Sequence, residues 1–109
     1  MPKAQRLGTF EQMVLLAILH AGKDAYGPLI LDKIMEGAGR NVSRGSLYVT
    51  LDRLERKAML QSTSGEPEPD RGGRPKRDVT VTDKGVSALR EARESLTALW
   101  AGLDAVLGK

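Results

Sequence analysis

Apolar residues recur every three or four positions along most of the chain, which is the period of an amphipathic α-helix. The clearest case is the stretch 41–58, NVSRGSLYVTLDRLERKA, where Ser43 can cap the first turn. One stripe of this predicted helix carries Leu47, Leu51, Leu54 and Ala58. The opposite face carries Gly45, Ser46, Val49, Arg53 and Arg56. That face suits a helix that enters a groove lined with phosphates, although an ordinary helix with a solvated cationic face would show the same pattern.

Two more helices are predicted upstream. The first runs from Thr9, its expected cap, to about His20, and the consecutive apolar residues 13–19 indicate burial both in its own domain and against a partner subunit. The second runs from Tyr26 to about Glu36. Its buried face is expected to hold Ile30, Leu31, Ile34 and Met35, with Gly37 and Gly39 at its end. The second and third predicted helices, with the short connection between them, therefore have the order helix, turn, helix.

The period changes to two after the third helix, which predicts strands at 59–64 and 76–82. The polar sequence GEPEPDRGGRP between them is too long for a tight turn. We therefore predict a β-hairpin with a charged tip. Its return edge carries Arg74, Lys76 and Arg77.

A last helix is predicted from Asp83 to about Leu107, with Thr82 as cap and Gly108 behind it. It would be about 37 Å long and would carry a heptad-like apolar seam, which needs a partner. The seam consists of Val86, Leu89, Arg93, Leu96, Trp100, Leu103 and Leu107. We expect a homodimer whose interface includes Leu15, Leu89, Leu96, Trp100, Leu103 and Leu107. Residues 1–82 would then form the DNA-binding domain and 83–109 the dimerisation helix, together one compact unit.

Composition excludes several classes of function. The 109 residues are 40% apolar and 28% charged, as in an ordinary globular domain, and include no cysteine for disulfides, thiolate zinc or thiol catalysis. His20 is the single histidine, and the carboxylates are not spaced with a nucleophile or a phosphate loop. We expect neither an enzyme nor a bound cofactor or metal. Without an apolar run of about 18 residues, the chain is expected in the cytoplasm and not at a membrane.

Charge distribution points to nucleic acid. The net charge is only +3. Residues 40–57 hold five cations against two acids, and residues 71–77 hold four cations and no acid, so the remainder is acidic. A chain that concentrates its positive charge in two segments presents a local basic patch. Double-stranded DNA is therefore the predicted partner.

Five motifs in order resemble one family of regulators. They are the opening LGTFEQMVLLAIL, the pair Tyr26–Gly27, the segment SRGSLYVTLDRLERKAML, the segment RGGRPKR, and Thr82 with Gly85. Together they resemble the PadR-like transcriptional regulators in their short form with a single C-terminal helix. The resemblance implies a mainly α fold with a small β-hairpin (α+β), a winged helix-turn-helix domain followed by a long dimerisation helix. Two positions depart from the family pattern, Ala58 where glycine is usual and Asp78 where an aromatic residue is frequent.

The resemblance also implies a homodimeric bacterial repressor, associated with the nucleoid when DNA-bound. Its third helix would lie in the major groove and its wing on the adjacent backbone or minor groove. The implied DNA contacts are Ser43, Arg44, Gly45, Ser46 and Tyr48 on the helix and Arg74, Lys76 and Arg77 on the wing. The helical wheel adds Val49 and Arg53. For Tyr48, packing with a wet hydroxyl is an equally good interpretation.

Two alternatives stay open. Winged helices also bind other proteins, so a protein-interaction module without specific DNA binding is the competing function. Trp100 either fills a dimer interface or stacks on a small aromatic effector, as the resemblance implies for some members of the family. A dimer would present two recognition helices, which predicts a palindromic operator.

Overall fold

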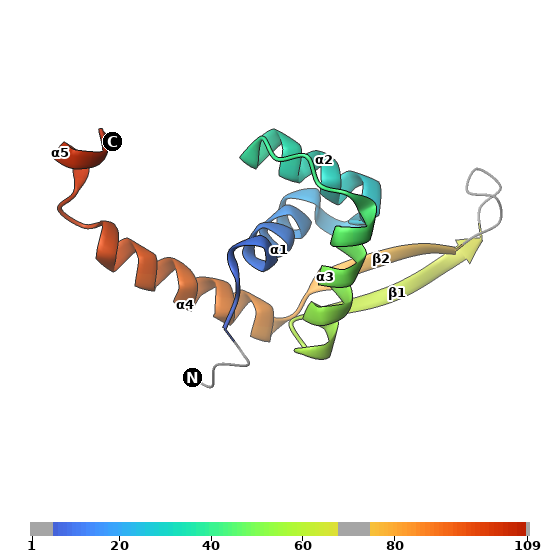
Figure 1. Cartoon of the computed structure of the whole chain (residues 1–109). Helices are drawn as coiled ribbons and strands as arrows, with labels where there is room; N and C mark the ends of the chain where they lie inside the picture. Colours follow the sequence, from blue (N-terminus) through green and yellow to red (C-terminus); the bar gives the residue numbers. More distant parts are fainter. Residues whose placement is uncertain (1–5, 68–74, 109) are drawn as a thin grey trace.

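The computed structural model describes residues 6–67 and 75–108. The elements are α1 (Thr9–Ala21), the 3₁₀ turn η2 (Gly22–Asp24), α2 (Gly27–Ala38), α3 (Arg44–Arg56), β1 (Leu60–Pro67), β2 (Pro75–Val81), α4 (Asp83–Trp100) and α5 (Asp104–Leu107). Figure 1 shows α1, α2 and α3 gathered in the centre, with the hairpin and α4 projecting in opposite directions. The molecule is correspondingly elongated, at 54 × 30 × 22 Å.

The cap of α1 differs from the prediction. Thr9 was expected as the N-cap, but the helix begins with Gly8 in that position. Oε1 of Glu11 accepts a hydrogen bond from the Gly8 amide at 2.8 Å. The carboxylate of the first turn thus replaces the hydroxyl that Thr9 was expected to supply.

The caps of α3 and α4 are those that the sequence predicts. Oγ of Ser43 accepts a hydrogen bond from the amide of Ser46 at 3.1 Å. Oγ1 of Thr82 accepts one from the amide of Gly85 at the same distance. Each hydroxyl satisfies an amide that the first helical turn leaves without a partner.

The core lies between the three central helices and the base of the hairpin. Its largest fully buried side chains are Leu15, Ile30, Leu47, Leu51, Leu54, Met59, Leu60, Val14 and Val79. Leu15 was expected at a dimer interface, but it is fully buried inside its own chain. The exposed leucines of α1 are Leu16 and Leu19. Met35 was expected in the core, yet it is 45% exposed, one turn from the end of α2 at Ala38.

The hairpin is antiparallel, with Leu60 opposite Val81 and Ser62 opposite Val79. Its register shifts beyond residue 64, near the tip. The amide of Val79 also donates to the carbonyl of Ala25 at 3.0 Å, so the segment after η2 joins the edge of β2. The alternating pattern therefore predicted the strands correctly, and this bond anchors the hairpin to the helical core.

The junction between the hairpin and α4 is tight. A Cβ on Gly85 would lie 2.7 Å from Cγ1 of Val81 and would collide with the carbonyl of Met59. The amide of Thr82 donates to that same carbonyl at 3.1 Å, and its hydroxyl donates to the carbonyl of Ala58 at 2.7 Å. Only glycine permits α4 to start this close to the hairpin.

The C-terminal region is not one helix. The prediction of a continuous helix to Leu107 is wrong, because α4 ends at Trp100 and Gly102 has a φ of 81°. The backbone then turns into the short α5. At 1.5 Å per residue, α4 is about 27 Å long instead of the expected 37 Å.

Ala58 was expected in the buried stripe of the third helix, and this too is wrong. The helix ends at Arg56, and Ala58 is an exposed residue with a φ of 62°. The buried face of α3 gains Thr50 instead. Alanine at a left-handed position is strained, which gives a physical reason for glycine being usual there.

Candidate nucleic-acid interface

The exposed face of α3 carries small, apolar and cationic residues, together with the acidic Asp52. Leu47, Leu51 and Leu54 point into the core, so the opposite side faces solvent. Val49 on that side is 56% exposed. A Cβ built on Gly45 would meet no atom within 4 Å. The glycine is therefore not needed for packing within the chain, and it leaves room for another molecule to approach the backbone.

The first turn of α3 is exposed on the side that faces away from buried Leu47. The side chains of Ser43, Arg44 and Ser46 all lie at the surface. The hydroxyl of Ser43 donates to Oγ of Ser46 at 3.0 Å, in addition to capping the helix. Helix N-termini favour anions, so this end combines a positive dipole with the side chain of an arginine.

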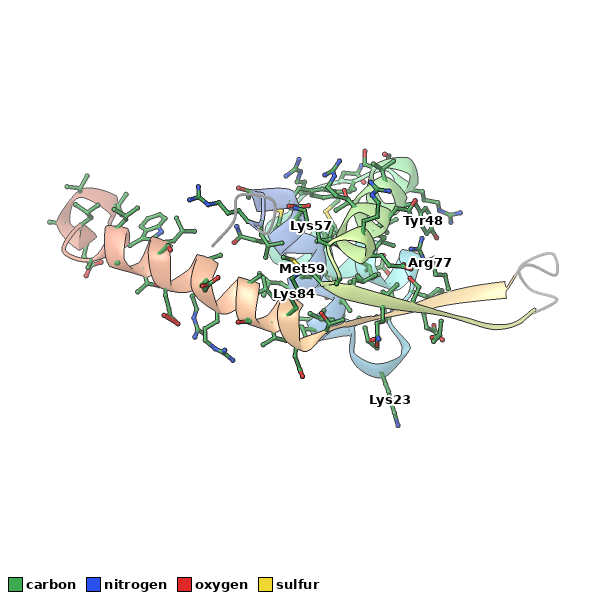
Figure 2. The ribbon with its side chains drawn as sticks, turned by 90° about the horizontal axis from the view of Figure 1, so that it is seen from below. Lys23, Tyr48, Lys57, Met59, Arg77 and Lys84 are labelled. Carbon is green, nitrogen blue, oxygen red and sulfur yellow. The ribbon has the colours of Figure 1, made fainter. Side chains whose placement is uncertain are left out.

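Tyr48 packs against the start of α2. Its hydroxyl lies so close to Gly27 that a Cβ on the glycine would overlap it, and the side chain is 37% exposed. Figure 2 places the tyrosine on α3, close to the edge of the helix. This contact supports the packing interpretation of Tyr48, while its partial exposure still permits a phosphate contact. It also explains the glycine of the Tyr26–Gly27 motif, because a larger residue at position 27 would overlap the tyrosine hydroxyl.

Arg77 is held by the acidic side of α3. Its Nη2 donates to Oδ1 of Asp52 at 3.1 Å and to Oε1 of Glu55 at 3.0 Å. Its Nε donates to Oγ of Ser62 at 3.1 Å, and the side chain is only 29% exposed. The hydrogen bonds from Ser62 and Arg77 lower the pKa of Glu55 below its ordinary value. The guanidinium expected on a phosphate is thus engaged within the chain.

The other two wing residues are Arg74 and Lys76. Arg74 lies outside the described residues. Lys76 belongs to β2, but its side chain is also outside the described part. Their expected contacts with DNA therefore stay predictions.

A partly buried ion pair with Glu11 removes Lys57 from the basic surface. Its ammonium donates to Oε2 and Oε1 of Glu11 at 2.8 and 3.0 Å and to the carbonyl of Arg6 at 3.1 Å. Burial raises the pKa of Glu11, but the bonds from Lys57 and the Gly8 amide outweigh it, and the pKa is lowered. Sequence reasoning missed this pair because 46 positions separate the two residues.

Three arginines of α3 remain for an external partner. Arg44, Arg53 and Arg56 are exposed and take part in none of the ion pairs found among the described residues. They bracket the small face formed by Gly45 and Val49. In the same described part of the chain, no group of three acidic or histidine side chains could hold a metal ion. Nor does any helix there have the length and apolar character needed to cross a bilayer.

A second surface lies between α1 and α4. It is an open groove of about 550 Å³, predominantly apolar. Its lining includes Gln12, Leu16 and Leu19 of α1 and Val86, Leu89, Arg90, Arg93, Leu96, Thr97 and Trp100 of α4. Beyond the groove, Leu103 and Leu107 are also exposed. Exposed apolar area of this kind indicates an interaction surface.

Comparison with known proteins identifies the matching family. Residues 15–91 match the model of the Transcriptional regulator PadR-like family. A PadR-like transcription factor from Bacteroides fragilis has a similar structure, with 27% sequence identity and a TM-score of 0.71 over 91% of this chain and 90% of that one. No curated protein matches this chain.

Two further structures show the same fold. A PadR family regulator from Clostridium difficile R20291 has 22% identity and a TM-score of 0.72, over 92% of this chain and 99% of that one. F93 from STIV, described as a winged-helix DNA-binding protein, has 20% identity and a TM-score of 0.64, over 84% and 90%. These matches confirm the resemblance, the winged-helix fold and the prediction that the chain is no enzyme, since the matching family consists of transcription regulators.

Proposed function

Because the chain belongs to the PadR-like family of transcriptional regulators, we propose that it is a homodimeric bacterial repressor that binds a palindromic DNA operator in the cytoplasm. The observation that carries this proposal is the exposed face of α3. Small Gly45 and apolar Val49 stand between arginines that form no ion pair in the described chain. A surface of this kind fits the floor and walls of a major groove.

In this proposal the first turn of α3 reads the bases. Arg44 and Ser46 would reach base edges, where arginine binds guanine in a bidentate manner. Gly45 would allow the backbone to approach, and Val49 would contact a thymine methyl group. Arg53, further along the same face, would bind the phosphates that border the groove.

The wing would bind the neighbouring backbone through Arg74 and Lys76. Support comes from the sequence: Lys76 belongs to β2 and Arg74 directly precedes this strand. The hairpin that β2 forms with β1 projects beyond α3 (Figure 1). Contacts of this kind position the protein without reading sequence. Tyr48 would contribute its hydroxyl at the edge of α3, in addition to its packing role.

The groove between α1 and α4 would hold the second subunit. Leu89, Leu96 and Trp100 line it, and Leu103 and Leu107 extend the apolar surface toward α5. Residues 83–109 would thus act as the dimerisation region and residues 1–82 as the DNA-binding domain. Two recognition helices related by a two-fold axis would require half-sites about one helical turn apart.

A small aromatic effector would act at the same interface. Trp100 is the only tryptophan, and small Ala98, Ala101 and Gly102 surround it in the sequence. A planar molecule between the subunits would release DNA only if it bound one spacing of the recognition helices better than another. The competing role of Trp100 is to fill the interface without a ligand.

Binding to duplex DNA at two salt concentrations tests the proposal. We expect affinity that falls steeply with salt, together with a dimer in sedimentation at micromolar concentration. A protein-interaction module would show neither salt-dependent binding nor preference for an operator. Absence of binding at low salt would refute the repressor assignment, and a folded monomer would refute the dimer.

A further inference from the structure

The cluster around Arg77 joins three elements of the DNA-binding domain. Asp52 and Glu55 come from α3, Ser62 from β1 and Arg77 from β2. Oγ of Ser62 also donates to Oε1 of Glu55 at 2.5 Å. The hydroxyl thus accepts a hydrogen bond from Arg77 and donates one to Glu55. Figure 2 shows Arg77 between the hairpin and α3. The cluster therefore connects the wing to the recognition helix through side chains alone.

The position of Asp52 makes this cluster relevant to DNA. At 100° per residue, Asp52 stands on the same exposed side of α3 as Gly45 and Arg56. Its side chain is 58% exposed. If α3 entered a DNA groove, a carboxylate on this face would lie near the phosphates. The two negative charges would repel each other and weaken binding. Two carboxylates with one guanidinium still leave the cluster one negative charge.

We propose that Arg77 is a positioning residue that masks the carboxylates of α3 and holds the wing against this helix, and that it binds no phosphate itself. This inference rests on the proposed DNA-binding function. The Nε and Nη2 atoms of Arg77 already donate hydrogen bonds to partners in β1 and α3, at distances of 3.0 to 3.1 Å. A phosphate would have to replace these partners and would leave Asp52 and Glu55 exposed to its own negative charge.

The test compares Arg77→Gln with the triple variant Asp52→Asn, Glu55→Gln, Arg77→Gln on duplex DNA over a range of salt. We expect the single change to weaken binding about fivefold or more, because it unmasks two carboxylates beside phosphates. The triple variant should bind within about twofold of wild type, with a salt slope within about 0.3 of the wild-type value.

A direct phosphate contact predicts a different result. Loss of one such contact lowers the salt slope by about 0.9 in both variants. A triple variant that binds as weakly as Arg77→Gln, with this reduced slope, would overturn the inference. If the single variant does not fold, the triple variant alone still decides, because its slope separates the two roles.

Lys23→Gln is the matched control. It removes the same charge from an exposed residue that projects from the other side of the molecule from α3 (Figure 2). We expect it to change affinity less than about twofold. If wild-type protein and this control both fail to bind DNA, the proposed function falls. If both bind and the triple variant stays weak, only the role given to Arg77 falls.

Discussion

The hydroxyl of Tyr48 lies against Gly27 with no space for a methyl group between them. The contact joins α3 to the first turn of α2, so it sets how closely the two helices approach. We expect Gly27→Ala to destabilise the fold by about 1 to 3 kcal/mol, because the new Cβ must displace the tyrosine. Urea unfolding measures the change.

Gly37 supplies the control for that prediction. It lies in the same helix, and a Cβ on it would meet no atom within 4 Å. Gly37→Ala should stabilise the protein by about 0.5 kcal/mol through helix propensity. Equal effects of the two substitutions would show that the Tyr48 contact has no energetic weight.

Arg44 and Lys76 should affect DNA binding in different ways. Arg44→Ala should cost about 1 to 3 kcal/mol on the preferred sequence and relax the preference, because the arginine is proposed to read a base. Lys76→Ala should weaken all sequences alike and lower the salt slope by about one. Binding to operator and random DNA measures both. A uniform loss from both variants would contradict base reading by α3.

The ion pair of Glu11 and Lys57 should make stability depend on acid. The pKa of Glu11 is lowered from 4.5, so its contribution is present above that pH and is lost as the pH falls through the folded value. Glu11→Gln should cost about 1.5 to 3 kcal/mol at pH 7. The difference from wild type should shrink toward pH 3 in urea unfolding.

Glu36 provides the comparison, since its ion pair with Lys33 lies at the surface. Glu36→Gln should cost less than about 1 kcal/mol at neutral pH. If Glu11→Gln behaved in the same way, the partly buried pair would contribute no more to stability than the surface pair does.

Ala58→Gly should stabilise the protein by about 1 kcal/mol, because glycine adopts a φ of 62° without strain. Ala98→Gly, on an exposed turn inside α4, should instead destabilise it by about 1 kcal/mol. Thermal unfolding distinguishes the two. A loss of stability in both would mean that Ala58 is not strained.

Trp100 fluorescence should report the proposed effector. The side chain is exposed in the single chain and lines the groove between α1 and α4. Planar aromatic cations and phenolic acids should quench it saturably if they bind there. If none does, while Trp100→Ala dissociates the dimer, the residue is structural and any effector binds elsewhere.

Local features of this fold were predictable from the sequence. Hydroxyl caps at Ser43 and Thr82, the apolar stripe of α3 and the alternation in the hairpin each depend on neighbours within a few residues. The break after α4 was not, because apolar spacing continues through residues 101–103 while the backbone leaves the helix at Ala101, with a ψ of 133°, and at Gly102, with a φ of 81°. Periodicity reports which side chains share a face and says nothing of a single backbone torsion.

Ion pairs between residues far apart in the sequence could not be predicted from the sequence. Counting cations placed Lys57 and Arg77 in the basic patch, but each one binds carboxylates from another element. Which cations remain for DNA depends on tertiary pairing. The residues expected at the first turn of α3 are indeed exposed, because a helix whose buried face is known also has a known exposed face.

The tight junction at Gly85 leaves no hinge between the wing and α4. Thr82 ends the hairpin and caps the helix with the same side chain, so any tilt of α4 is transmitted to the base of the wing. The far end of α4 lies about 27 Å from this junction, at the helical rise of 1.5 Å per residue, so a tilt of the helix would be largest there. In the proposed dimer, a small rotation where the two α4 helices meet would move each DNA-binding domain, with its α3 and wing, as a rigid body relative to the DNA.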